Sequence, residues 1–331
     1  MEKDLHYLQG LLWEFYKTWV NNHTVLDGSS KELDMHKLYE RLTLLLNTES
    51  DLSSQLLQAS DSTITLVEKN FSSAVNFIVD VVGPEKIFCL SYEENPNGMD
   101  YADLLLIISD SHREAFLDIE PVLHFACLKH YNLSCSLFKE YHFYNQIREG
   151  YIYYCLACNT ENMIYDNGHQ ELPELRIENA HIRIEKAKLK FYTGLSKAKT
   201  FYETAEIHWN SNLPMAAFML HQAVESYLRT LMKSLTGQDR PTHSINTLLR
   251  FSRRFTSKLS LAMNSQDLEG NRLIELLELS YLGYRYSEKY QIEAKDLDEL
   301  FERVGKLHEL TEQTFLDWLG KYESLVNSIN T

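Results

Sequence analysis

The side chains best placed to do chemistry stand on one predicted helix around residue 221. His221, Gln222 and Glu225 occupy positions i, i+1 and i+4, so they lie together on one helical face. A histidine can act as a general base, and a carboxylate or amide beside it can hold it in place. These residues either line a polar pocket or form a hydrogen-bonded polar layer between packed helices.

A second group of candidates is the densest basic cluster of the chain. It consists of Arg250, Arg253, Arg254 and Lys258. On a single helix, residues 250, 254 and 258 share a face because they are spaced by four. Such a face is suited to phosphate or RNA. The alternative interpretation is a solvated face that balances an acidic surface.

Composition limits the partners that the protein can have. The 331 residues include 32 Lys and Arg against 47 Asp and Glu, which gives a net charge of −15. Such a surface repels nucleic acid, so any RNA or nucleotide site must be a local positive region, and we expect no binding to duplex DNA. With 12 glycines and 6 prolines, helix breakers are scarce, which favours a largely helical protein.

The cysteines and the apolar runs indicate a cytoplasmic protein. Five cysteines are an odd number, and Cys155 and Cys158, although spaced as CxxC, have no second pair of metal ligands. We therefore expect reduced structural thiols and no metal site. The sequence starts without the pattern of a signal peptide and has no apolar run of the ~18 residues that a membrane span needs, so no membrane partner is expected.

Periodicity predicts a small sheet followed by helices, an α+β protein that is mostly helical. The first 60 residues and residues 64–81 carry helical apolar stripes, and a helix is expected over 111–129. Short apolar runs predict strands over 86–92, 103–109, 133–138 and 151–157. After a polar linker, helices are expected over 181–209, 213–235, 244–258, 267–285 and 295–327. The predicted domains are 1–62, 63–172 and 184–331, with 173–183 as the linker.

The helical region resembles a HEPN domain. The resemblance rests on the helix Phe218–Arg229, the loop and helix start over Gly237–Leu249, and the segment Leu276–Tyr286. It implies an up-and-down helical bundle that forms a homodimer through its helices. It also implies a role with RNA or nucleotides, with His243 fixing the loop or capping the next helix.

Ribonucleases of the HEPN family place a histidine four to six residues after an arginine. Here the arginine is Arg285, and no histidine follows it in that window; the next is His308. Glu288 and Tyr290 are poor general bases near neutral pH without a large pKa shift. Arg285 either binds phosphate or pairs with an acid inside the bundle.

Residues from about 64 to 170 resemble a degenerate minimal nucleotidyltransferase. Leu90 and Ser91 stand at the phosphate loop of that family, Asp103 stands on its carboxylate strand, and residues 162–168 look like its closing strand. The glycine and the second carboxylate of the family are missing. One carboxylate cannot hold two magnesium ions, so nucleotide transfer and bound magnesium are not expected.

These observations predict a non-catalytic regulatory protein that binds a nucleotide or RNA. The alternatives are a HEPN ribonuclease that uses Arg285 with an atypical base, and a structural dimerisation module. The candidate ligand-binding residues are Ser91, Asp103, His221, Gln222, Glu225, Arg285 and Tyr286, beside the basic residues Arg250, Arg254 and Lys258. No cofactor is expected apart from a bound nucleotide. Ser91 and Asp103 should open onto a polar pocket that faces the helical region, where Arg285 supplies the positive charge.

Overall fold

The chain folds into two compact units in a computed structural model. The structure describes residues 63–94, 100–112, 116–127, 132–174, 178, 180–263, 268–286 and 290–329. In this part of the chain, the smaller unit holds helix α3 (Thr63–Val82) and most of helix α4 (Phe116–Cys127), and the larger unit holds residues from 84 to 116 and from 131 onward. The helices predicted for the first 60 residues lie outside the described residues.

Helix α3 confirms the helix predicted over residues 64–81. Val67, Phe71, Ala74 and Ile78 recur with the helical period, and all four are buried. Phe77 of α3 lies beside Phe125 of α4, with ring centroids 6.1 Å apart. Helix α4 begins at Phe116 and not at the predicted Ser111.

The larger unit begins with a four-stranded mixed sheet of order β3-β2-β1-β4. Strand β1 (Lys86–Glu93) is antiparallel to β2 (Tyr101–Ile108) and to β4 (Met163–Asp166), and β2 is parallel to β3 (Leu133–Lys139). Every residue of β2 is buried, as its continuous apolar run predicts for a central strand. Three predicted strands and the closing strand over 162–168 are therefore confirmed.

The strand predicted over residues 151–157 is wrong. The chain forms the short helix α6 (Ile152–Ala157) there, directly after another short helix, α5 (Glu140–Arg148). A short apolar run does not by itself distinguish a strand from a buried helix. Tyr153 and Tyr154 are adjacent in sequence and both are buried. Tyr153 packs against Phe255 and Trp318. On a helix, adjacent side chains can both face a core, whereas on a strand they point to opposite faces.

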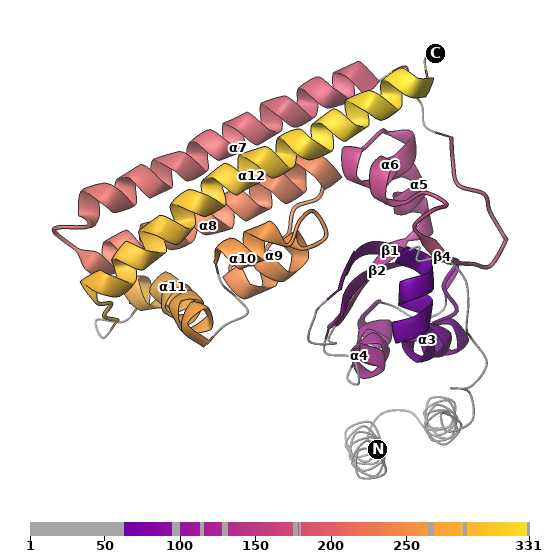
Figure 1. Ribbon diagram of the computed structural model, residues 1–331, viewed down its shortest axis with the longest axis horizontal. Coiled ribbons are helices and arrows are strands. Elements are labelled where there is room, and N and C mark those ends of the chain that lie inside the picture. The colour runs from indigo at the N-terminus through magenta and orange to yellow at the C-terminus, as the bar shows by residue number, and fades with distance from the viewer. Residues whose placement is uncertain are drawn as a thin grey trace, which may run out of the picture. The chain divides into compact units, whose positions relative to one another are not determined.

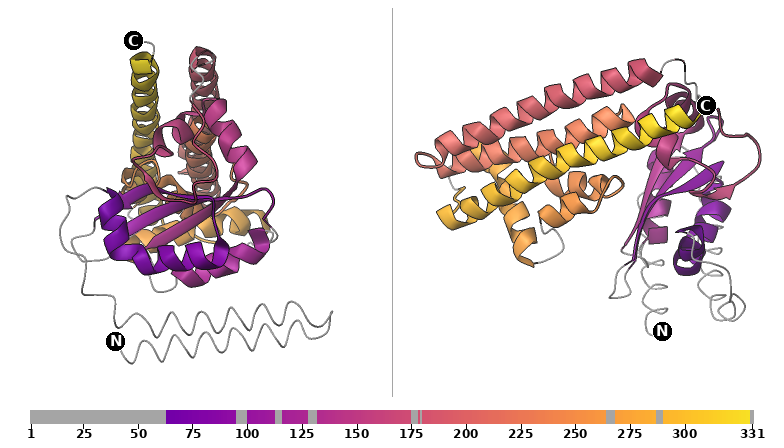
Figure 2. Two further views of the ribbon diagram at one scale, coloured as in Figure 1. Left: turned by 90° about the vertical axis from the view of Figure 1, so that its right-hand side faces the viewer. Right: turned by 45° about the horizontal axis from the view of Figure 1, so that its top comes forward.

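Six further helices are described in the rest of the larger unit. They are α7 (Ala180–His208), α8 (Leu213–Thr236), α9 (Ile245–Ser252), α10 (Lys258–Ala262), α11 (Leu268–Tyr286) and α12 (Ala294–Ile329). Helices α7, α8 and α12 lie side by side (Figures 1 and 2). Within the described residues, no helix combines the length and the apolar character that crossing a membrane requires.

The ends of α8 follow from local sequence. The Asn212 side chain accepts a hydrogen bond from the Met215 backbone N–H at 3.1 Å, which caps the first turn, and Pro214 occupies that turn. At the other end Gly237 adopts φ +74°, the left-handed conformation that ends many helices. Four predicted helices, over 181–209, 213–235, 267–285 and 295–327, are confirmed.

The helix predicted over residues 244–258 is two helices instead. Helix α9 ends at Ser252, whose hydroxyl donates to the Leu249 carbonyl at 2.8 Å, and α10 begins at Lys258. A serine that bonds to the preceding turn competes with the regular helical pattern. Arg254 lies in the turn between the two helices. Arg250, Arg254 and Lys258 therefore do not share one helical face, which corrects the predicted basic surface.

Candidate functional site

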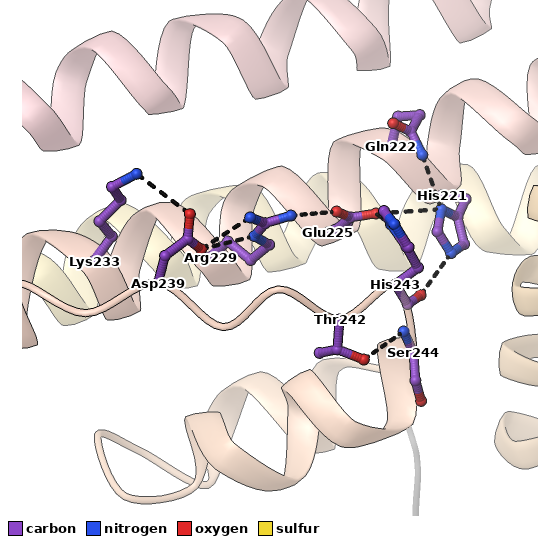
Figure 3. Close-up of polar contacts among 9 residues, drawn as sticks. All are labelled: His221, Gln222, Glu225, Arg229, Lys233, Asp239, Thr242, His243 and Ser244. Carbon is purple, nitrogen blue, oxygen red and sulfur yellow. Dashed lines mark hydrogen bonds and ion pairs between the residues drawn. The ribbon is translucent and has the colours of Figure 1, made fainter.

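A network of polar side chains extends along one face of α8. Figure 3 shows His221, Glu225, Arg229 and Lys233 projecting from that helix toward the loop that follows it. Glu225 is buried, and its Oε1 accepts from Arg229 at 2.7 Å, while its Oε2 contacts His243 Nδ1 at 3.0 Å. Because the carboxylate is paired on both oxygens, its charge is compensated inside the fold.

His243 is placed by the loop between α8 and α9. Its backbone carbonyl accepts from the fully buried His221 Nε2 at 3.0 Å, so the loop is tied to α8. The cap of α9 is Ser244, whose hydroxyl accepts from the Thr247 N–H. His243 thus fixes the loop, as the sequence suggested, but does not cap the helix. Its side chain is 54% exposed.

The state of the two histidines follows from their partners. Burial lowers the pKa of His221, although Glu225 opposes this, so His221 is neutral at pH 7. It donates through Nε2 to the His243 carbonyl, and its Nδ1 accepts from Gln222 Nε2 at 3.2 Å. His243 donates through Nδ1 to Glu225, which leaves its Nε2 as an acceptor at an exposed position.

Helix α11 adds an aromatic ring and a cation to this group. The His243 and His221 rings stack on Tyr281 at centroid distances of 4.4 Å and 5.1 Å. The Arg285 guanidinium carbon lies 5.3 Å from the centroid of the same Tyr281 ring, and Arg285 is exposed. The structure therefore brings together His221, Gln222, Glu225 and Arg285, whereas from the sequence Arg285 was expected beside Ser91 and Asp103. Tyr286 ends α11, and its side chain lies outside the described part.

A second polar group lies where the sheet meets the turn after α9. Ser91 of β1 and Asp103 of β2 are cross-strand partners. Asp103 is 1% exposed, and its Oδ2 accepts a hydrogen bond from Arg254 Nε at 3.1 Å and forms an ion pair with Arg254 Nη2 at 2.9 Å. Asp103 thus meets the helical region through Arg254, whereas Arg285 was expected to supply the charge. The open polar pocket at Ser91 and Asp103 stays a prediction.

The Cys155–Cys158 pair and possible metal ligands remain to be described. Burial raises the pKa of the Cys155 thiol, on α6, to about 12. It also raises the pKa of the buried Cys158 thiol, directly after α6, so both thiols stay protonated. Among the described residues, no three His, Cys, Asp or Glu side chains are grouped so that they could hold a metal ion.

Sequence reasoning did not place Tyr281 and His243 in this group of side chains. Tyr281 lies four residues before Arg285, and this spacing on a helix was the available signal. His243 was assigned to the loop because nothing in its surroundings revealed that Glu225, 18 residues away, would bond to its ring.

A comparison with known protein families finds a match that includes the helices carrying this polar group. The model of the HEPN domain matches residues 192–314, which include α8, α9, α11 and the loop that carries His243. The sheet lies outside the match. A search of curated proteins gave no match for this chain.

Proposed function

We propose that the helical region binds RNA through the surface formed by His243, Tyr281 and Arg285. The observation that carries the proposal is the half-exposed His243 ring stacked on Tyr281, with the Arg285 guanidinium beside the same ring. Unpaired RNA bases stack on aromatic and histidine rings, and arginine contacts the phosphates. The match to the HEPN domain supports a role with RNA or nucleotides.

Local charge supports this choice of surface. The whole chain carries −15, so RNA needs a position where acids are already neutralised. Glu225, the acid nearest to His243, is bonded to Arg229, and Asp239 beside it is bonded to Arg229 and Lys233. Arg285 and the aromatic rings therefore face a ligand without an uncompensated carboxylate from this network.

Fluorescence anisotropy with a labelled single-stranded RNA tests the proposal. We expect Arg285→Gln to weaken binding roughly tenfold, the loss of one charge-assisted hydrogen bond. Arg272→Gln is the matched control, because it removes the same charge from the same helix at a residue that pairs with Glu269 and Asp296. Equal affinities for wild type and Arg285→Gln, or no RNA binding by the wild type, would refute the proposal.

A second candidate function is RNA cleavage, favoured by the contact of Glu225 Oε2 with His243 Nδ1. A carboxylate that holds Nδ1–H leaves Nε2 free to take the proton from a ribose 2′-hydroxyl. That oxygen then attacks the adjacent phosphorus, a 2′,3′-cyclic phosphate forms, and the 5′-oxygen leaves with a proton from solvent. Arg285 is placed to stabilise the charge on the phosphate. Tyr290 is a weaker base candidate because its hydroxyl donates to the Leu276 carbonyl.

The two functions separate in one experiment. RNA that remains intact in the presence of wild-type protein but binds to it supports the non-catalytic function. If the wild type cleaves RNA, His243→Gln should abolish cleavage and retain binding within a few-fold. Cleavage that His243→Gln leaves unchanged would remove His243 as the base.

We also propose that two copies associate through α11. Leu279 and Leu282 are 59% and 60% exposed on this helix, close in sequence to Tyr281 and Arg285. Exposed leucines of this kind are suited to a second copy, because burial of apolar area favours association. Light scattering should give a dimer for the wild type and a monomer for Leu279→Glu/Leu282→Glu. A wild-type monomer at micromolar concentration would contradict it.

A further inference from the structure

The turn after α9 concentrates more positive charge than the nearby acids neutralise. Arg253 pairs with Glu93 at 2.6 Å, and Arg254 pairs with Asp103 at 2.9 Å. Arg240, from the loop after α8, lies over the Phe251 ring with its guanidinium carbon 3.5 Å from the centroid. The Arg254 guanidinium carbon lies 5.1 Å from that same centroid, so one phenyl ring holds two guanidinium groups.

Arg240 and Arg250 have no carboxylate partner among the described residues. Burial, together with the neighbouring Arg254 and Arg250, lowers the pKa of Arg240 to about 10. The carboxylate that favours the charge on Arg240 is Asp103, and that group already pairs with Arg254. Four arginines against Asp103 and Glu93 give 4 − 2 = 2 uncompensated positive charges.

The surroundings also hold buried polar atoms without a hydrogen-bond partner. Ser91 Oγ and Arg253 Nε are donors that a phosphate oxygen can accept from, and both lie where β1 and β2 meet Arg253 and Arg254. Asp103 Oδ1 is an acceptor, so it needs a donor such as water and not an anion. A buried donor or acceptor without a partner costs about 1–3 kcal/mol, so such atoms mark a place where a ligand or a water completes the structure. Arg250 is exposed, which gives access to the group from solvent.

We propose that Arg240 and Arg250, with Arg253 and Arg254 behind them, form a binding site for a small polyphosphate anion, either free or carried by a nucleotide. Guanidinium groups bind phosphate oxygens with paired hydrogen bonds, and several negative charges on one ligand match the two uncompensated cations. An anion here removes the repulsion between Arg240 and its neighbours. This site and the RNA surface use different arginines, Arg240 and Arg250 here and Arg285 there.

Thermal unfolding and calorimetry of the full chain with tripolyphosphate, ATP and adenosine test the site. We expect tripolyphosphate and ATP to raise the unfolding temperature, and adenosine at the same concentration to leave it unchanged. Similar affinities for the two phosphates indicate a free polyphosphate as ligand, and tighter binding of ATP indicates a nucleotide. Sodium chloride at matched ionic strength controls for general screening.

Variants assign the effect to the arginines. Arg240→Gln should weaken tripolyphosphate binding roughly tenfold. Arg250→Gln, at an exposed position, gives a second test if Arg240→Gln does not fold. Arg285→Gln should bind tripolyphosphate like the wild type while losing RNA affinity, so this site and the RNA surface can fail independently. Absence of stabilisation by both phosphates, or equal binding by wild type, Arg240→Gln and Arg250→Gln, would overturn the proposal.

Discussion

Two buried acids in this protein meet arginine, and they differ in what else they touch. Asp103 on β2 and its partner Arg254 are both buried, with side chains 1% and 9% exposed. Glu225 on α8 is also buried, but it shares its carboxylate between Arg229 and the half-exposed ring of His243. One buried carboxylate therefore pairs only with a buried arginine and holds two parts of the fold together. The other also contacts a side chain that solvent reaches.

The difference has a physical basis in desolvation. Burial raises the pKa of Asp103, and Arg254, Arg240 and Arg250 oppose that rise, so the ion pair depends on arginine remaining in place. Burial by itself lowers the pKa of Arg254, but Asp103 and the neighbouring tyrosines outweigh this effect, so the pKa is raised. At Glu225 the partners Arg229 and His243 are 27% and 54% exposed and keep part of their hydration, which makes each contact weaker and easier to rearrange.

The largest expected effect comes from breaking the Asp103–Arg254 pair. Arg254→Met leaves a buried carboxylate without a partner and should lower the free energy of unfolding by about 3–5 kcal/mol, measured by urea denaturation. The double variant Arg254→Met/Asp103→Leu should recover most of that loss, because no buried charge remains. If the double variant is as unstable as the single one, the pair is not the source of the effect.

A smaller loss is expected at Glu225. Glu225→Gln removes the charge that Arg229 and His243 contact and should cost about 1.5–3 kcal/mol in urea denaturation. Glu203→Gln is the matched control, since Glu203 and its partner Lys199 are both more than half exposed, and it should stay within about 0.5 kcal/mol. Equal losses in the two variants would show that Glu225 is no more strongly held than a surface acid.

A substitution at Gly237 tests the close contact between the end of α8 and Tyr151, the residue before α6. A Cβ at Gly237 would lie 2.0 Å from the Tyr151 ring, whereas a Cβ at Gly168 meets nothing within 4 Å. Both glycines have left-handed φ, +74° and +77°, so the backbone strain of an alanine is the same. Gly237→Ala should therefore be less stable than Gly168→Ala by about 1–3 kcal/mol in thermal unfolding. Equal values would mean that the Tyr151 ring moves aside easily.

The smallest effect expected is a pH dependence from His221. Its folded pKa is lowered by burial, so below the unfolded value of about 6.5 the unfolded chain binds a proton that the folded chain does not. Stability should fall as pH drops below that value, by at most roughly 1.4 kcal/mol per unit. His221→Gln should reduce this slope when unfolding free energies at pH 7.5 and 5.5 are compared. A variant with an unchanged slope would assign the pH dependence to other groups.

How much of this could be read from the sequence depends on the range of each interaction. The ends of α8 were predicted because Asn212, Pro214 and Gly237 act on residues within a few positions. The helix α6 was missed because six apolar residues fit either a strand or a helix. Arg254 was placed with Arg250 and Lys258 on one face, since the end of α9 at Ser252 leaves only a weak local signal.

The sequence by itself determined the α+β architecture, the three strands β1 to β3 and the long helices of the larger unit. It also determined that His221, Gln222 and Glu225 lie on one face. These features could be predicted because periodicity and caps are local properties of the chain. The tertiary structure decided which charges meet. Arg254 contacts Asp103 across 151 residues, and His243 contacts Glu225 only because the loop returns along α8. Such pairings depend on the path of the whole backbone, and no local pattern of residue types specifies that path.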